Sequence, residues 1–389
     1  MHRGRGPPAP LPRSLNPRRA ALVDCPPSLV HPAMELGLFS FVETRPEDGR
    51  QPAPQAARRL EHLLEEARLA DAVGLDAFGV GEHHRPDYVA SAPAVLLAAM
   101  AAQTERIRLT SAVSVLGSDD PLRVFQDFAT LDLLSSGRAE IIVGRGSFTE
   151  SFPLFGHDLR AYELLFEEKL DLLLAARDAE RPVWQGRHRP PLDGSSWVLP
   201  RPLQPRIPIW RAVGGTPESF VRAGRAGLPL AVAIIGGTPD PFVPLVELYR
   251  RAGAEAGHDP AALRVSVNGH GFLAGTPEAA AEIAWPPTQE TMGRIGRERG
   301  WAPPTRARFD AERSPRGALL VGSAQEAIDK ILRMHELFGL ARYSVQLTVG
   351  PTPHADVLRA IELFGTEVAP VVRREAGTAA PATRAEAVR

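Results

Sequence analysis

The chain has 389 residues, 44% hydrophobic and 23% charged, a balance that excludes a disordered or fibrous protein and allows a large core. Its 45 basic and 46 acidic residues give a net charge of −1, so no overall field favours nucleic acid or an anionic membrane. The single cysteine, Cys25, excludes an intramolecular disulfide and a cysteine metal cluster, and it fits a reducing cytoplasm. The longest apolar run, residues 228–237, is far shorter than the roughly 20 residues of a membrane span.

The two ends of the chain differ from its middle. Residues 1–33 hold eight prolines and five arginines without hydrophobic periodicity, so we expect a disordered extension, with Met34 as the working start of the folded chain. We expect a disordered C-terminal tail over residues 374–389. The folded domain is therefore predicted over residues 34–373.

From Met34 onward, short apolar runs alternate with amphipathic segments. Strands are predicted to begin near Glu35, Leu75, Ile107, Ala139, Ile207, Leu228, Arg264 and Tyr343. Helices are predicted over residues 58–73, 121–134, 162–176, 216–226, 242–256, 324–338 and 355–364, where apolar residues recur every three or four positions. Eight strands that alternate with helices give a parallel sheet.

The parallel sheet is predicted to close into a barrel. No Gly-x-Gly-x-x-Gly follows the first strand, as an open dinucleotide-binding sheet would require. The strand spacing suits a (β/α)₈ TIM barrel with insertions at residues 149–206 and 275–342. The sequence therefore predicts one α/β domain whose chemistry lies at the C-terminal ends of the strands.

The second predicted strand runs into Gly81-Glu82-His83-His84. Adjacent residues of a strand point to opposite faces, so at most one of His83 and His84 faces the barrel mouth, and we expect no shared metal. A histidine at a strand end beside a buried glutamate fits a catalytic role. A purely structural, hydrogen-bonded histidine is the alternative.

Two further strand ends predict a phosphate site. Arg145 lies between two glycines after an apolar strand, where a guanidinium needs an anionic partner. Gly214-Gly215-Thr216 joins a strand to a helix whose first amides can bind an anion. The alternatives are a salt bridge from Arg145 to an acid such as Glu140 or Glu82, and an ordinary helix cap at Thr216.

These segments give the chain a recognisable pattern. It resembles the bacterial luciferase-like family of flavin-dependent oxidoreductases over about residues 34–373. The resemblance is carried by Gly81-Glu82-His83-His84, Ser111 to Leu116, Leu131 to Arg138, and Val143-Gly144-Arg145-Gly146. A (β/α)₈ barrel is the fold that this resemblance implies.

The resemblance also implies roles for individual residues. His83 would lie near the reactive face of the flavin, with His84 as its less certain neighbour. Ala112 and Val113 match the site of a non-proline cis peptide under the flavin ring. Arg145 matches the phosphate-binding arginine, and Gly214, Gly215, Thr216 and Ser219 match positions that hold the same phosphate. Bacterial luciferase has other residues at positions 215 and 216, so light emission and a long-chain aldehyde substrate are not expected.

The function that we expect is a flavin-dependent monooxygenase acting on paired donors. Reduced FMN would react with O₂ to give a flavin hydroperoxide that transfers one oxygen atom to a small organic substrate, with His83 as an acid or base near neutral pH. One alternative is hydride transfer with the deazaflavin coenzyme F-420, whose anionic tail would need further basic residues such as Arg294, Arg297 and Arg299. Another is a flavin-binding barrel without catalysis.

The family reading has consequences beyond the site. It implies a homodimer in the cytoplasm and a separate flavin reductase or loosely used NAD(P)H, with no nucleic-acid, membrane or metal partner. Because the chemistry needs water to be excluded, we expect a lid over residues 285–317. The alternative is that this segment forms a peripheral helical excursion.

Overall fold

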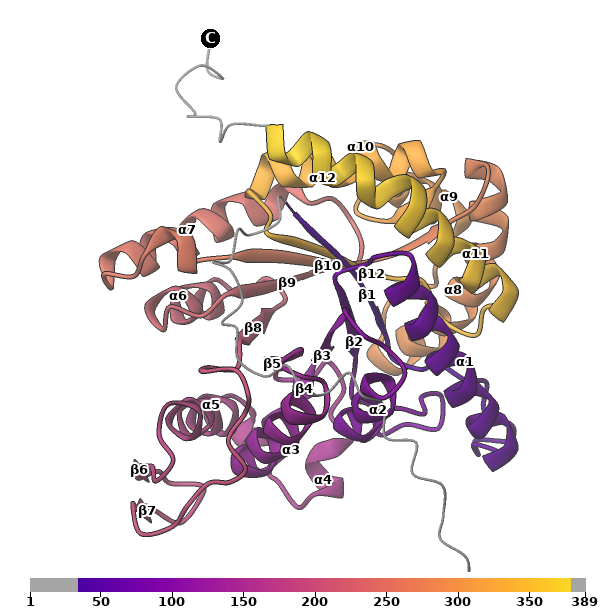
Figure 1. Ribbon diagram of the computed structural model, residues 1–389. Helices are drawn as coiled ribbons and strands as arrows, with labels where there is room; N and C mark the ends of the chain where they lie inside the picture. The colour runs from indigo at the N-terminus through magenta and orange to yellow at the C-terminus, as the bar shows by residue number, and fades with distance from the viewer. Residues whose placement is uncertain (1–33, 379–389) are drawn as a thin grey trace, which may run out of the picture. The chain divides into compact units, whose positions relative to one another are not determined.

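Eight parallel strands form a closed barrel in the computed structural model, which describes residues 34–378 (Figure 1). They are β1 (Glu35–Ser40), β2 (Ala77–Val80), β3 (Arg108–Ser111), β5 (Ala139–Gly144), β8 (Ile209–Val213), β9 (Leu230–Ile234), β10 (Val265–Leu273) and β12 (Arg342–Gln346). The barrel closes because β1 pairs with both β2 and β12, while β10 pairs with both β9 and β12. The predicted (β/α)₈ fold is confirmed, and each barrel strand begins within two residues of its predicted start.

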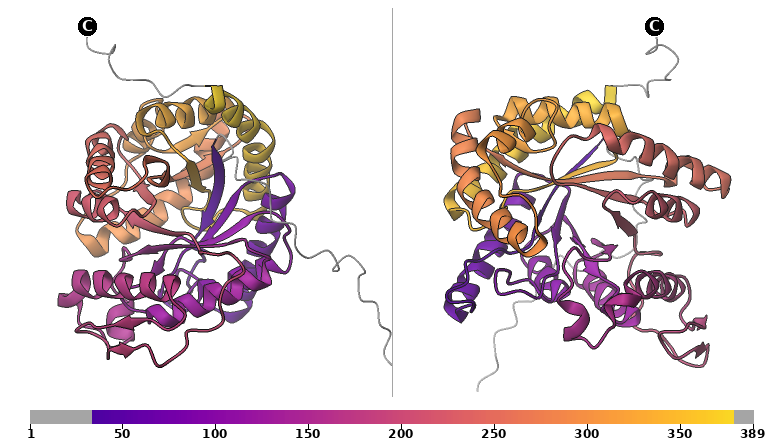
Figure 2. Two further views of the ribbon diagram at one scale, coloured as in Figure 1. Left: turned by 60° about the vertical axis from the view of Figure 1, so that its left-hand side comes forward. Right: turned by 180° about the vertical axis from the view of Figure 1, so that it is seen from behind.

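The helices surround the barrel, as the views in Figure 2 show. They are α1 (Ala53–Ala72), α2 (Pro93–Ala101), α3 (Pro121–Leu134), α4 (Ser151–Leu154), α5 (Tyr162–Asp178), α6 (Pro217–Arg225), α7 (Val243–Glu255), α8 (Pro277–Arg299), α9 (Arg306–Glu312), α10 (Ala324–Phe338), α11 (His354–Leu363) and α12 (Ala369–Thr378). All seven predicted helices are present, and α2, α4, α8, α9 and α12 were not predicted. None of the helices in this part of the chain is long and apolar enough to cross a membrane.

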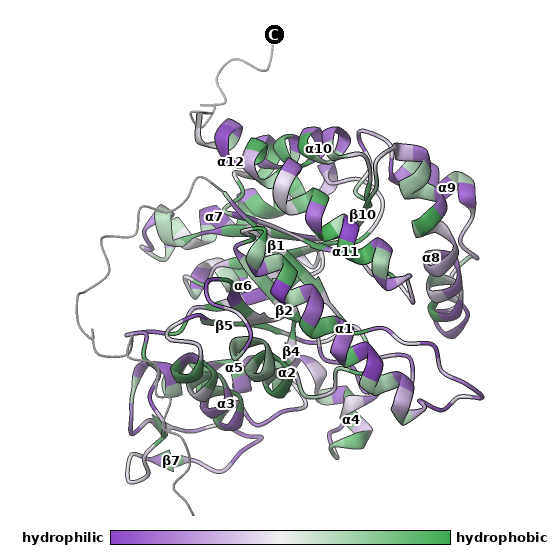
Figure 3. Ribbon diagram, turned by 45° about the vertical axis from the view of Figure 1, so that its right-hand side comes forward, coloured by the Kyte–Doolittle hydropathy of each residue, from purple (hydrophilic) through white to green (hydrophobic). Residues whose placement is uncertain are grey.

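Local sequence explains several helix boundaries. Helix α10 begins with a capping box, in which the Ser323 hydroxyl accepts from the Glu326 amide and the Glu326 carboxylate accepts from the Ser323 amide. It ends at Gly339, whose φ of 57° lies in the left-handed region that glycine tolerates best. Helix α1 alternates between apolar and polar residues, whereas α2 is apolar almost throughout (Figure 3).

The C-terminal boundary predicted from sequence is wrong by several residues. Residues 374–378 continue helix α12 instead of starting a disordered tail, and Ala376 is buried. Arg374, Glu375 and Ala376 are good helix formers, and burial of the Ala376 side chain stabilises the last turns. The extension expected over residues 1–33 and the rest of the tail lie outside the described residues.

Four short strands lie beside the barrel strands or in the insertions. Strand β4 (Ser114–Val115) pairs with β5, and β11 (Leu320–Gly322) pairs with the end of β10. Strands β6 (Val183–Trp184) and β7 (Leu192–Asp193) form an antiparallel hairpin inside the insertion at residues 149–206.

The barrel interior is filled by charged side chains at its N-terminal end and contains a cavity at its C-terminal end. At the N-terminal end, the buried guanidinium of Arg342 donates to Glu35 and to Glu140, both at 2.7 Å. Arg108 and Arg264 pair with the same two carboxylates, so this layer is a closed ionic network. Towards the C-terminal end, small inward residues leave space at the barrel mouth. They include Ala112, Ala212, Ala231 and Ala233.

Candidate active site

A cavity of about 290 Å³ opens at the C-terminal end of the barrel. It is lined by His83, Ala112, Val113, Arg145 and Gly214 among the residues predicted for the site. The other four, His84, Gly215, Thr216 and Ser219, do not line it. Most of the remaining wall is apolar or small, and comes from β1, β4, β5, β8, β9 and the residues that follow these strands. The barrel therefore brings the predicted histidine and arginine to one cavity, as their positions at strand ends require.

His83 is held in an aromatic cage. Its ring contacts Phe41, Tyr88 and Phe148, with centroid separations of 4.5, 4.4 and 5.0 Å. The side chain is buried, and its Nε2 atom has no hydrogen-bond partner among the described residues. Burial lowers the pKa of His83 to about 3, and the nearby charges of Arg85 and His84 act in the same direction. The imidazole is therefore neutral at physiological pH, which is not the near-neutral pKa that the sequence led us to expect.

His84 points away from His83, as the alternation of side chains along an extended segment predicts. Its Nε2 atom lies 2.9 Å from Oε1 of Glu82, and Oε2 of Glu82 accepts from the Val115 amide at 2.8 Å. Glu82 is buried, so it joins the end of β2 to β4 beside the cavity. His84 lines a separate pocket of about 190 Å³, which makes it a supporting residue in this geometry.

The peptide bond between Ala112 and Val113 is cis, as the family resemblance implies. Both residues line the cavity. The Val113 side chain would lie 2.7 Å from a Cβ atom added at Gly144, so the glycine allows the two strand ends to approach.

Arg145 already has an acidic partner. Its Nη1 atom donates to Oε2 of Glu163 at 2.5 Å, and the guanidinium lies 5.7 Å from the ring of Tyr162. The sequence analysis considered a salt bridge from Arg145 to Glu140 or Glu82 as the alternative to a phosphate. Arg145 does form a salt bridge, but with Glu163 and with neither of those two acids. Glu140 binds Arg342 and Arg108, and Glu82 binds His84.

The start of α6 lies next in the chain after the cavity residue Gly214. Gly215 has a φ of 128°, and Thr216 is the N-cap residue but its side chain makes no capping hydrogen bond. The hydroxyl of Ser219 is buried and has no partner among the described residues. These polar groups are the ones that an anion at the helix start would satisfy.

Residues 285–317, which we call the cover segment, comprise most of α8, α9 and their flanking loops. Four ion pairs or hydrogen bonds tie α8 to loops at the barrel mouth: Glu290 to Arg45, Arg294 to Asp87, Glu298 to Arg85, and Arg299 to the Ser147 carbonyl. Arg299 also lies 4.9 Å from the ring of Phe148, which contacts His83. The segment is helical, and its C-terminal end reaches the residues that enclose the cavity.

Two polar cavity residues escaped the sequence analysis. Asn268 and His270 lie on β10 and line the cavity. They alternate with Gly269, so both side chains face the barrel interior. The polar alternation Ser266, Asn268, His270 within an otherwise apolar strand is the signal that could have identified them.

Comparison with known proteins places the chain in a family. A sequence model described as luciferase-like monooxygenase matches residues 34–340. The chain belongs to this family. An uncharacterised protein of Sinorhizobium fredii is 25% identical over 338 residues, which cover 83% of this chain and 94% of the relative. The N-acetyl-S-alkylcysteine monooxygenase of Bacillus subtilis is 33% identical over 46% of this chain and 52% of its own length.

Solved structures agree with this assignment. The monooxygenase RslO1 from Streptomyces bottropensis has a TM-score of 0.71 and 25% identity, covering 87% of this chain and 99% of its own. The oxygenating constituent of 3,6-diketocamphane monooxygenase from Pseudomonas putida, in complex with FMN, has a TM-score of 0.68 and 21% identity, covering 87% and 98%. An F420-dependent secondary alcohol dehydrogenase has a TM-score of 0.67 and 19% identity, covering 87% and 99%. The last two show the shared barrel fold.

Proposed function

We propose that this luciferase-like protein is an FMN-dependent monooxygenase that uses O₂ on a small organic substrate. The observation that carries the proposal is the polarity of the cavity wall. Arg145 and Gly214, which leads into α6, lie in a wall that also includes small apolar residues and the caged His83. A flavin mononucleotide has the same division, with an anionic phosphate at one end and a flat apolar ring at the other.

The residues present fit that group. Arg145 and the first amides of α6 would hold the phosphate, and the buried Ser219 hydroxyl would gain a partner there. Ala112 and Val113 would support the ring. Bound reduced flavin supplies the electrons that activate oxygen.

His83 offers one unsatisfied atom to the reacting groups. Nε2 is buried without a partner, so it can donate or accept one hydrogen bond there, according to the tautomer. Because burial keeps the ring neutral, His83 would orient a reacting oxygen through a hydrogen bond, without carrying a positive charge. The cover segment would exclude water through the contacts of Arg85, Arg294 and Arg299 at the mouth.

Two of the three arginines named for the deazaflavin alternative already have protein partners. Arg294 binds Asp87, and Arg299 binds the Ser147 carbonyl, so both hold the cover segment. A longer anionic cofactor tail would have to displace these contacts. Hydride transfer with that coenzyme therefore ranks second.

The decisive experiment compares FMN with riboflavin, which lacks the phosphate. Wild-type protein should bind FMN at least tenfold more tightly than riboflavin, and Arg145→Ala should abolish most of this difference, since a charged hydrogen bond contributes about 1.5–3 kcal/mol. Arg160→Ala is the matched control, because Arg160 is exposed and pairs only locally with Asp158. Equal binding of FMN by wild type and Arg145→Ala would refute the phosphate site.

A cofactor screen separates the three candidate activities. Oxygen uptake with reduced FMN supports the monooxygenase, and hydride transfer with the deazaflavin supports the alternative. FMN binding without either activity would leave a non-catalytic flavin-binding barrel. Oxygen uptake that needs an added flavin reductase would support a separate reductase as partner.

We also propose that the chain works as a cytoplasmic homodimer. The support is that two neighbouring helices each expose a large apolar side chain, Val95 on α2 at 68% and Leu134 on α3 at 61%. Helix α2 has no polar face to present to solvent. Analytical ultracentrifugation tests the assembly, and Val95→Glu should shift a dimer towards monomer.

A further inference from the structure

The two polar side chains on β10 have no role in the flavin site described above. Asn268 and His270 lie on β10, between β9 and β12. Asn268 is opposite Ala233 of β9, and His270 is opposite Gln346 of β12. Both line the large cavity. Their neighbours on β9, Ala231 and Ala233, are too small to reach them across the open space.

Neither side chain has a protein partner. No hydrogen bond or ion pair involves Asn268 or the ring of His270 within residues 34–378. Gln346, the register neighbour of His270, gives its amide hydrogens to Glu43 and to the Thr348 carbonyl. Other histidines are bound, such as His84 to Glu82 and His354 to Glu65. Polar groups that face a cavity and lack protein partners are available to a ligand.

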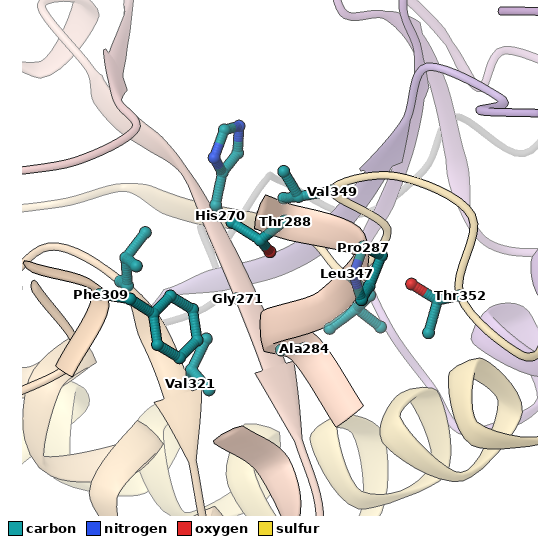
Figure 4. A pocket seen from close by; sticks show the side chains of 11 residues that line it. His270, Gly271, Ala284, Pro287, Thr288, Phe309, Val321, Leu347, Val349 and Thr352 are labelled. Atoms are coloured by element: carbon teal, nitrogen blue, oxygen red, sulfur yellow. The ribbon is translucent and has the colours of Figure 1, made fainter. Parts of the chain in front are cut away.

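The imidazole of His270 points into the large cavity. His270 also lines a small cavity of about 20 Å³, whose other lining residues include Phe309 and Val321, and its ring extends away from these two side chains (Figure 4). His270 is half-buried and is one of the residues that line the large cavity. Burial lowers the pKa of His270 to about 4, and no charged group contributes to the shift.

The β10 wall is therefore polar but uncharged. The charged groups that line the cavity are elsewhere: Arg145 is bound to Glu163, and Glu82 is bound to His84 and the Val115 amide. A carboxylate or ammonium group placed against β10 would lose its hydration without gaining an opposite charge, which weakens its binding. A neutral carbonyl would accept N–H bonds from the Asn268 amide and the neutral imidazole.

We propose that Asn268 and His270 form the substrate subsite of this enzyme, and that it takes a small neutral molecule bearing a carbonyl group. This inference rests on the proposed function, because it assumes that the flavin occupies the side of the cavity nearest Arg145. Asn268 and His270 position the substrate oxygen, and the apolar side chains Phe39, Phe41 and Ile235 surround its carbon skeleton.

The test uses FMN-loaded full-length protein and three ring compounds of equal size. Cyclohexanone is the neutral carbonyl, cyclohexanecarboxylate the anion and cyclohexylammonium the cation, with binding followed by saturation-transfer NMR and flavin absorbance. Wild type should bind cyclohexanone at least tenfold more tightly than either ion. Asn268→Leu and His270→Leu should each weaken cyclohexanone binding about tenfold, and His270→Gln should restore part of the loss.

Controls separate this proposal from the flavin site. FMN affinity should stay within about twofold in all three variants, and His258→Gln, a surface histidine that binds the Arg225 carbonyl, should change nothing. Loss of FMN binding in the β10 variants would overturn the subsite and assign the pair to the flavin. No preference for cyclohexanone in wild type would also overturn it. Failure of wild type to bind FMN would instead refute the proposed function.

Discussion

Arg145 shares the carboxylate of Glu163 with Arg222. Arg145 donates to Glu163 at 2.5 Å and Arg222 donates to it at 3.0 Å, so the guanidinium assigned to phosphate is paired with an acid on α5. An incoming phosphate must compete with that acid or displace it. The pair is partly solvent-exposed, so its contribution is on the order of 1 kcal/mol or less.

Removing the acid should therefore favour the phosphate. Glu163→Gln is expected to raise FMN affinity about threefold while riboflavin affinity stays constant, as measured by fluorescence titration. Asp158→Asn, which changes a nearby exposed acid, is the control. Weaker FMN binding in Glu163→Gln would show that Glu163 is needed to orient Arg145.

The cover segment should loosen when Arg85, which binds it from the loop after β2, is replaced. Arg85 donates to Glu150 at 2.5 Å and to Glu298 at 2.6 Å, so it joins the loop after β5 to α8. Arg85→Met should increase hydrogen exchange of residues 285–299 and raise the FMN dissociation rate several-fold. Increased salt should have a similar effect on wild type, because part of each pair is exposed. Unchanged exchange in Arg85→Met would show that these pairs do not hold the segment.

The ionic layer in the barrel floor should be sensitive to loss of one partner. Arg342→Met leaves the buried carboxylates of Glu35 and Glu140 with only Arg264 and Arg108, and about 3 kcal/mol of unfolding free energy should be lost. Adding Glu140→Gln to this variant should recover part of the loss. A change below 1 kcal/mol in urea unfolding would contradict the prediction.

Glu43 should make stability fall as pH rises. Burial raises the pKa of Glu43 to about 7, although Arg59 and hydrogen bonds from Thr348 and Gln346 oppose the shift. Its unfolded pKa is near 4.5, so the native state holds a proton that the unfolded chain has released between pH 4.5 and 7. Stability contributed by this group is complete below pH 4.5 and lost by about pH 7, a change of about 3 kcal/mol.

Glu43→Gln tests this, because an amide cannot ionise. Chemical unfolding at pH 5 and pH 8 should show about 3 kcal/mol less pH dependence in Glu43→Gln than in wild type. Glu61→Gln, at an exposed position on α1, should behave as wild type. The same pH dependence in both variants would place the titration elsewhere.

His83 should act without titrating near neutral pH. The pKa of His83 is lowered to about 3, so the ring stays neutral from pH 5 to 9. The dependence of the rate on pH in that range should therefore have the same shape in wild type and in His83→Gln. His83→Leu should reduce oxygen-transfer activity about 100-fold, and His83→Gln less, because only glutamine keeps a hydrogen-bonding group. An inflection near pH 6.5 that disappears in both variants would contradict the neutral role.

Much of the barrel follows from local sequence. The alternation of strands and helices located all eight barrel strands, and the period of two in the segment after β2 separated His83 from His84. The start of α10 is recognisable at Ser323 because its capping box consists of four consecutive residues, Ser323 to Glu326. These features depend on neighbours in the chain.

Other features depend on contacts that are distant in sequence. Nothing near Arg145 shows that its partner is Glu163, which α5 brings from an insertion. Helix α8 runs through Pro286 and Pro287, which local propensity disfavours, and is tied to the barrel mouth by Arg294 and Glu298. Tertiary ion pairs of this kind override local propensity.

The chain leaves the barrel for the cover segment at the end of β10 and returns beside the same point, at β11. Strand β10 continues beyond the barrel, where its end pairs with β11, and the Ala274 amide donates to the Gly322 carbonyl at 3.2 Å. The segment between these residues is thus a side loop closed by two adjacent strands. A change in its length or sequence would therefore alter the enclosure of the cavity mouth without shifting the register of the barrel strands.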